Sequence, residues 1–337
     1  MAVVTERIES IDDFLGASET RFFADGFRKI RQRVSQLRIE QADGTGTVRA
    51  TAGVHYPTDW SKKDETALRP HLSSIDALLV AVQLGEAFLT HAHGLDGVQR
   101  RAMWLRRFVM KAGSAPQENL EAFDATAVHV ETVPGVDSPL VSVFDCQVGS
   151  IKVRTEIAHE AFGEHRGASP GPAFHQHLDD LLGEAAGRHY GEGYKLSRST
   201  VGDVLLDLPE GRVEATAKVV HPGGPEGSQG LGGDHHASLS MFDALTVLAQ
   251  LGQVLLYRLD GITRQTSNTL WLREVTISCD RPDQALGQDL TAVSWISKSQ
   301  RFEHRGATWR SAALEGTLGG FSTHCALVHQ LPDGVEQ

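Results

Sequence analysis

The chain has 337 residues, of which 40% are hydrophobic, and its formal net charge is −11. This length fits about two domains of ordinary size, and an acidic chain without a basic tract is a poor partner for nucleic acid. Three cysteines without CxxC spacing predict reduced thiols rather than a disulfide framework or a zinc site. Residues 1–15 are too acidic for a signal peptide, and no apolar run is long enough to cross a bilayer. We therefore expect a cytoplasmic protein without a membrane partner.

The sequence repeats itself at a separation of 167 positions. The matching segments are residues 72–78 (LSSIDAL) with 239–245 (LSMFDAL), 83–85 with 250–252 (both QLG), and 104–106 with 271–273 (both WLR). A solenoid unit recurs every 20 to 50 residues or so, and therefore this period indicates a duplicated domain.

The duplication predicts how the chain is divided. We expect residues 1–160 to form the first repeat, residues 161–188 a linker with a short helix near 176–186, and residues 189–337 the second repeat. A duplicated domain makes a pseudo-twofold dimer within one chain, and a pocket is expected where the two halves meet.

Each half begins with a predicted β-hairpin. In the first half, residues 27–41 and 47–56 contain alternating stretches on either side of a turn at Asp43-Gly44. In the second half, residues 194–208 and 212–221 flank a turn at residues 209–211.

One strongly apolar helix follows each hairpin, predicted at residues 75–90 and 242–256. Both begin with Ser-x-x-Asp, a capping-box-like start, in which Ser73 and Ser240 precede Asp76 and Asp243. A helix that is apolar on most of its circumference is buried.

Several strands follow the first helix, predicted at residues 103–111, 125–132, 140–148 and 150–159. The order hairpin, buried helix and antiparallel strands fits a sheet wrapped around one central helix, which is the hotdog arrangement. We therefore predict an α+β double hotdog, with two tandem antiparallel sheets each wrapped round a central buried helix. The alternative is two independent α+β domains of another topology.

Each predicted helix carries a polar stripe on one face. Its members are Asp76, Gln83 and Glu86 in the first helix, and Asp243, Gln250 and Gln253 in the second. On one interpretation the aspartates close the capping boxes and the glutamines bond to neighbouring backbone. On the other, the stripes line a pocket at the seam, where Asp76 and Asp243 act in catalysis and Gln83 and Gln250 bind substrate. The two interpretations are compatible.

A loop rich in glycine, residues 221–236, precedes the second helix. Gly232 and Gly233 permit the backbone to approach a substrate closely, and His221 is a further substrate-binding candidate. His235 and His236 are the preferred proton acceptors, because histidine moves protons near neutral pH. The alternative is a solvated loop with incidental histidines. No acidic or cysteine ligand stands at firm spacing, so we predict no metal.

The first half contains a weaker version of this arrangement. His71 precedes Asp76, and it is the next catalytic candidate if both halves contribute to one cleft. Lys62, Lys63 and Arg69 form either a solvated face or a site for a phosphate or carboxylate.

The repeated segments resemble a known family. Residues 72–78 with Gln83-Leu84, and their copy at residues 239–251, resemble the avirulence D (AvrD) family over nearly the whole chain. Asp234-His235 with Asp243-Ala244 is similar to a segment of A-factor synthase-type double-hotdog enzymes, although Asp243 replaces their glutamate and the following Pro-Gly is absent. Residues 249–252 (AQLG) are similar to hydroxyacyl-thioester dehydratases, but Thr246 stands in place of their acid.

These resemblances imply a substrate and a reaction. The avirulence D family and the A-factor synthase-type enzymes both form lactones. Resemblance to them implies that a β-ketoacyl thioester of coenzyme A or acyl carrier protein is joined to a small polyol or sugar. The avirulence D family is associated with acyl-sugar lactones called syringolides. The implied protein is an acyltransferase or condensing enzyme of specialised metabolism, without a cofactor, in which a homodimer is possible. The alternatives are an acyl thioesterase or dehydratase on the same fold, or a non-catalytic acyl-binding scaffold.

Overall fold

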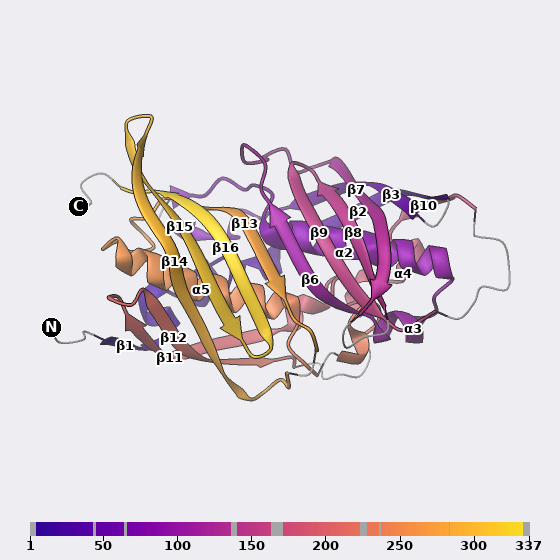
Figure 1. Cartoon of the computed structure of the whole chain (residues 1–337). Helices are drawn as coiled ribbons and strands as arrows, with labels where there is room; N and C mark the ends of the chain where they lie inside the picture. Colours follow the sequence, from indigo (N-terminus) through magenta and orange to yellow (C-terminus); the bar gives the residue numbers. More distant parts are fainter. Residues whose placement is uncertain are drawn as a thin grey trace.

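The computed structural model describes residues 5–42, 45–63, 66–135, 140–162, 171–222, 228–235, 237–282 and 284–332. The predicted turn at Asp43-Gly44 lies outside these ranges. The described residues form one continuous 14-stranded antiparallel sheet that curves around two long helices (Figure 1).

The two halves of the sheet contain corresponding strands around corresponding helices. The first half has β2 (Arg31–Ala42), β3 (Thr45–His55), β6 (Trp104–Lys111), β7 (Phe123–Pro134), β8 (Leu140–Val148) and β9 (Ile151–His159) around α2 (Ser74–His93). The second half has β11 (Arg198–Asp207), β12 (Arg212–Val220), β13 (Leu270–Ser278), β14 (Asp289–His304), β15 (Ala307–Leu318) and β16 (Phe321–Gln330) around α5 (Met241–Leu259). The double hotdog is therefore confirmed by the strand order and by the position of each helix against its half-sheet.

Both central helices begin with the capping box that the sequence predicts. The Ser73 side chain accepts the Asp76 amide at 3.2 Å, and the Asp76 carboxylate accepts the Ser73 amide at 3.0 Å. Gly94 ends α2 in the left-handed region at φ 60°. By length and composition α2 is apolar enough to cross a membrane, but 94% of its apolar window is buried inside the fold. Its apolar composition is accounted for by packing inside the curved sheet.

A local twofold relation joins the halves where β6 pairs with β13. Val109 lies opposite Thr276, which is its own counterpart 167 positions later. Two reciprocal hydrogen bonds flank this pair at 2.9 Å, from the Ala112 amide to the Arg273 carbonyl and from the Cys279 amide to the Arg106 carbonyl. Cys279 is the counterpart of Ala112 and Arg273 is the counterpart of Arg106, so each bond is the symmetric copy of the other. The seam is therefore self-complementary, as in a symmetric dimer.

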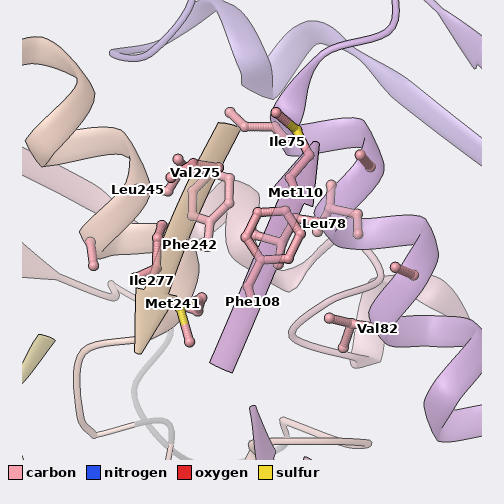
Figure 2. Packing of buried hydrophobic residues seen from close by; sticks show 14 of the residues in the cluster. Ile75, Leu78, Val82, Phe108, Met110, Met241, Phe242, Leu245, Val275 and Ile277 are labelled. Atoms are coloured by element: carbon pink, nitrogen blue, oxygen red, sulfur yellow. The ribbon is translucent and has the colours of Figure 1, made fainter. Parts of the chain in front are cut away.

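The apolar core continues across this seam. Figure 2 shows Phe108 and Met110 of the first half near Phe242 and Val275 of the second. The aromatic ring of Phe27 also contacts Phe242, with ring centroids 4.8 Å apart. Burying one such side chain stabilises the fold by about 1.5–3 kcal/mol. Because these side chains come from both halves and contact one another, the two halves share one core.

The segments that open the two repeats are exchanged between the halves. β1 (Thr5–Ser10) pairs with β11 and α1 (Ile11–Leu15) packs against α5, whereas β10 (Ala173–His177) pairs with β2 and α4 (Asp179–Leu182) packs against α2. The segment that we predict as a linker therefore supplies a strand and a short helix to the first half. The division at residues 160 and 189 stays a prediction.

His329 on β16 is a buried histidine with a depressed pKa. Its side chain is 0% exposed, and neither ring nitrogen has a hydrogen-bond partner among the described residues. Burial lowers its pKa to about 4, against the opposing charge of Asp260 and with the help of Lys63 and Arg310. Between pH 6.5 and about 4 the unfolded chain binds this proton and the folded chain does not. Stability is therefore lost as the pH falls through that window.

We expect His329→Leu to remove part of this acid sensitivity. Urea unfolding of both proteins at pH 7.5 and pH 4 measures the effect. The wild type should lose roughly 2–3 kcal/mol more than the variant between the two pH values, because one pKa unit corresponds to about 1.4 kcal/mol. Equal losses in the two proteins would show that His329 does not titrate in this way.

Candidate functional site

A cavity of about 950 Å³ lies between the halves and is called the open cavity below. The first half contributes the start of α2 and the chain ahead of it, including Phe22, Tyr56, Trp60, His71, Ser73 and Ser74. The second half contributes one face of α5 and the adjacent strands, including Leu245, Leu248, Ala249, Gly252, Gln253 and Trp271. The position of this cavity agrees with the pocket that the duplication predicts at the seam.

A carboxylate and a phenol are joined at the α2 end of the open cavity. Asp76 is 0% exposed and accepts hydrogen bonds from the Tyr56 hydroxyl, from Gln32 Nε2 at 2.8 Å and from Ser73. Burial, and then the charge of Asp76, raises the pKa of Tyr56 well above its ordinary value. Tyr56 is therefore protonated, and because its one proton is donated to Asp76, its hydroxyl oxygen is left as an acceptor. Asp76 contacts the cavity through Tyr56 and Ser73, which both line it.

His71 lies in the wall of the same cavity. Its Nδ1 is 3.3 Å from the Arg69 carbonyl oxygen, which can only accept, so the proton is placed on Nδ1. The lone pair is then on Nε2, which has no hydrogen-bond partner among the described residues. The ring packs on Trp271, with ring centroids 4.9 Å apart. This tautomer makes Nε2 a proton acceptor.

The rest of the open cavity is largely apolar. Leu245, Leu248 and Ala249 follow one face of α5, and the adjacent strands add Val275 and Leu314, among others. A Cβ at Gly252 would lie 3.0 Å from Leu314 Cδ1, so the absence of a side chain keeps this part of the wall clear. A linear acyl chain is the kind of group that such a wall accommodates.

A second cavity of about 30 Å³, called the closed cavity below, occupies the corresponding place in the other repeat. The correspondence is read from lining residues that are 167 positions apart. These pairs are Phe22 with His189, Leu72 with Leu239, Ser73 with Ser240, Ser74 with Met241, Trp271 with Trp104, and Leu272 with Leu105. The chain thus holds two versions of one site, of which one is spacious and one is nearly filled.

Asp243 is buried beside the closed cavity. The Ser197 hydroxyl donates to its carboxylate, and His221 Nε2 lies 3.6 Å from Oδ2. The His221 ring stacks on His189 with centroids 5.9 Å apart. Burial alone would raise the pKa of Asp243, but His221, Ser197 and His189 together hold it well below its ordinary value. Asp243 is therefore a carboxylate at neutral pH.

The structure brings the predicted site residues together in two groups. His71 and Asp76 belong to the open cavity, whereas His221, Gly232, Gly233, His235 and Asp243 surround the closed one or its loop. His235 Nε2 lies 3.2 Å from the Ala102 carbonyl oxygen. His236 lies outside the described residues.

Gln83 and Gln250 belong to neither group, because their amide groups bind arginines of the exchanged segments. Arg21 Nη1 donates to Gln250 Oε1 at 2.7 Å, and Arg188 Nη1 donates to Gln83 Oε1 at 2.9 Å. Each arginine also binds an aspartate of its own segment, and these are Asp12 and Asp179. The aspartates and the arginines are each 167 positions apart, which is the signal that could have identified them from sequence.

Within the part of the chain that the structure describes, no three histidine, cysteine or acidic side chains are grouped so as to hold a metal ion. The polar groups that line the open cavity include Tyr56, His71 and Gln253, together with charged side chains such as Lys63, Arg69 and Arg273.

A sequence model of the family described as Pseudomonas avirulence D protein (AvrD) matches residues 6–332. No match was found among curated proteins. Among solved structures, the chain is 12% identical to a conserved protein of unknown function with a hot dog fold from Alicyclobacillus acidocaldarius, covering 86% of this chain and 94% of that one with a TM-score of 0.38.

Two further solved structures are similar at the same level. The acyl-CoA thioesterase II TesB2 from Mycobacterium marinum is 11% identical, covering 88% of this chain and 97% of that one, with a TM-score of 0.36. The dehydratase domain of the polyketide PpsC from Mycobacterium tuberculosis is 10% identical, covering 88% and 96%, with a TM-score of 0.34. The fold assignment rests on the strand order and helix packing described above.

Proposed function

Because the chain belongs to the avirulence D family, we propose that it is an enzyme of specialised metabolism that transfers a β-ketoacyl group from a thioester to a small sugar-derived acceptor. The donor is a thioester of coenzyme A or acyl carrier protein, and the product is of the lactone type. The observation that carries the proposal is the open cavity of about 950 Å³, in which an apolar wall along α5 meets His71 and Tyr56 near the start of α2.

The acyl chain lies along α5 in this proposal, against Leu245, Leu248 and Ala249. Its thioester carbonyl then faces the start of α2. Ser73 and Asp76 satisfy each other's amides in the capping box, so the Ser74 and Ile75 amides are the remaining donors of the first turn. These two amides are suited to polarise a carbonyl and to stabilise the oxyanion formed from it. The Tyr56 hydroxyl already donates to Asp76, so its oxygen is suited to accept a hydrogen bond from a further hydroxyl of the acceptor.

The transfer step exchanges a C–S bond for a C–O bond. His71 Nε2 accepts the proton of an acceptor hydroxyl as its oxygen attacks the thioester carbonyl carbon. The tetrahedral oxyanion collapses, the C–S bond breaks, and the proton passes to the departing thiolate. The products are the ester and one free thiol. The lactone ring then closes when the carbon between the two carbonyls of the β-ketoacyl group loses a proton and bonds to the ketone carbon of the acceptor, whose oxygen takes up that proton and becomes a hydroxyl. Asp76 is a positioning residue, because it contacts the cavity through Tyr56.

The proposal is tested by mixing the protein with a β-ketoacyl thioester, with and without a ketose such as xylulose, and by following thiol release and product mass. Acceptor-dependent thiol release with a matching ester or lactone supports acyl transfer. Thiol release that does not need the acceptor would instead support a thioesterase. Binding without any product would support an acyl-binding scaffold and would contradict the enzymatic proposal.

Ala249→Phe is expected to make the enzyme sensitive to acyl-chain length. Ala249 lies in the open cavity, while its counterpart Val82 is fully buried, so a larger side chain at 249 fills space that the chain end would use. We expect kcat/KM to fall at least about tenfold for a twelve-carbon substrate and less than about threefold for a four-carbon one, since pocket volume discriminates by one to three kcal/mol. Equal losses on both substrates would place the acyl chain elsewhere.

A further inference from the structure

The two repeats place corresponding arginines at corresponding irregularities of the sheet. Arg106 and Arg273 each end the repeated sequence WLR and lie 167 positions apart. Arg106 is the extra residue of a bulge where β6 pairs with β9, and Arg273 is the extra residue of a bulge where β13 pairs with β16. Because a bulge re-aims the side chain at which it occurs, the two arginines share the same departure from regular strand geometry.

The loops that follow β6 and β13 also correspond. They comprise residues 112–117 after β6, and residues 279–282 and 284 after β13. In each loop the carbonyl of the final glutamine accepts the amide of the leucine that precedes the capping serine of the central helix, at 2.9 Å in the first repeat and 2.8 Å in the second. These pairs are Gln117 with Leu72 and Gln284 with Leu239. The two loops are therefore anchored at the same place in their own repeats.

The two arginines differ in what they meet across the seam. Arg106 Nη2 lies 2.9 Å from the carboxylate of Asp280, which follows the residue whose amide binds the Arg106 carbonyl. By the local twofold relation, Arg273 meets Gly113 in the same way, and glycine offers no carboxylate. A Cβ at Gly113 would lie 2.9 Å from the Ser150 carbonyl oxygen, so this position admits a side chain only if the loop moves. Among the described residues, no carboxylate forms an ion pair with Arg273.

The arginine without a carboxylate is the one that lines the open cavity. Arg273 is exposed, and Gly113 and the residues that follow it line the same cavity. Trp271, two positions earlier on β13, contacts the His71 ring with centroids 4.9 Å apart. Two residues of a strand span about 6.6 Å. Arg273 therefore belongs to the part of the wall that holds the proton acceptor of the proposed reaction.

The carboxylates that line the open cavity have other partners. Among the described residues these are Glu118, which lies 2.8 Å from Arg69, and Glu315, which lies 2.7 Å from His324. Neither carboxylate is paired with Arg273. An anionic group that enters the cavity can therefore take the place that Asp280 has beside the other arginine.

We propose that Arg273 binds a phosphate group of a substrate. The proposal rests on the proposed function for the identity of the substrates. Neither a β-ketoacyl chain nor a ketose contains a carboxylate, whereas coenzyme A and the phosphopantetheine arm of a carrier protein contain phosphate, and so does a phosphorylated sugar. The planar guanidinium of arginine binds phosphate through parallel hydrogen bonds, as it binds a carboxylate. The bound group is thus a phosphate ester, of the donor or of the acceptor.

Isothermal titration calorimetry with two pairs of probes tests the proposal. One pair is 4′-phosphopantetheine and pantetheine, and the other is xylulose 5-phosphate and xylulose. In the wild type we expect the phosphorylated member of at least one pair to bind about 10- to 100-fold more tightly, which is the effect of hydrogen bonds to a charged group. The pair that shows this preference identifies the donor or the acceptor as the source of the phosphate.

Matched variants of the two arginines make the test specific. Arg273→Gln should abolish the preference for phosphate, while Arg106→Gln should keep it, because Arg106 is already paired with Asp280. Both side chains can be shortened without opening the core, and circular dichroism should show native folding. No preference in either pair of probes, or a preference that survives in folded Arg273→Gln, would overturn the proposal.

The binding measurements do not depend on turnover, so failure of the phosphate site and failure of the reaction give different results. A phosphate preference that requires Arg273, in a protein that releases no thiol from a β-ketoacyl thioester, would contradict the reaction and leave the phosphate site intact. Acyl transfer by a wild type without any phosphate preference would contradict the phosphate site and leave the reaction intact.

Discussion

Tyr56→Phe will lower the rate of acyl transfer by about 100-fold, because it removes the oxygen that orients the acceptor beside His71 and a small misplacement of a reactant costs a loss of that order. The substitution removes only the hydroxyl that bonds to Asp76 and lies in the open cavity. Because the ring and its packing on Trp60 remain, with centroids 5.0 Å apart, the fold should persist. Steady-state kinetics should show the loss in kcat with KM little changed, and near-ultraviolet circular dichroism should confirm the native packing.

A matched variant decides which of the two sites carries the reaction. The sequence favours His235 as the proton acceptor, whereas cavity volume favours the site of Tyr56 and His71. His235→Ala should therefore change the rate far less than Tyr56→Phe, because His235 lies beside a cavity of about 30 Å³ and bonds to the Ala102 carbonyl. A 100-fold loss in His235→Ala with an active Tyr56→Phe would move the chemistry to the closed site.

Much of the fold could be predicted from the sequence, because local signals agreed with one another. The capping boxes at Ser73 and Ser240 fixed the starts of both helices, and all-round apolarity predicted their burial. Strand β8 was predicted with its observed bounds. The exchange of β1 and β10 between the halves was not predicted. The partner of a strand depends on which sheet edges meet in the folded chain. The sequences of β1 and β10 carry no signal that tells whether they pair within their own half or with the other half.

The candidate site was harder to predict, since both repeats carry the same marks. The Ser-x-x-Asp starts and the polar stripes are present twice, and glycines made the loop before α5 look like a substrate-binding loop. Only the packed structure shows that the Leu231 amide of this loop bonds to Glu86 on α2, and that Gln253, the counterpart of Glu86, lines the open cavity. Tyr56 gave no signal because its importance comes from its contact with Asp76, 20 positions away.

Arg188→Met will destabilise the fold by about 2–4 kcal/mol, because it leaves the Gln83 carbonyl oxygen buried without this donor. Arg188 is 2% exposed and bonds to Gln83 on α2, to the Gly183 carbonyl and to Asp179. Methionine keeps most of the volume, so the loss reports polar contacts more than a cavity. Chemical denaturation measures the change. The control is Arg7→Met, whose ion pair with Asp203 is largely exposed and should contribute little.

The same arginine tests whether the exchanged segment couples the halves. If the Arg188–Gln83 bond is the source of the loss, then Gln83→Leu in the Arg188→Met background should cost less than in the wild type, because no buried group is left orphaned. Additive losses from the two substitutions would contradict that coupling.

Since the Arg21–Gln250 bond makes the reciprocal connection, neither half can lose its opening segment without leaving a polar group of the other half unpaired. We therefore expect calorimetry to show one cooperative transition for the whole chain, and two separated transitions would mean that the seam and the exchanged strands do not bind the halves into one unit.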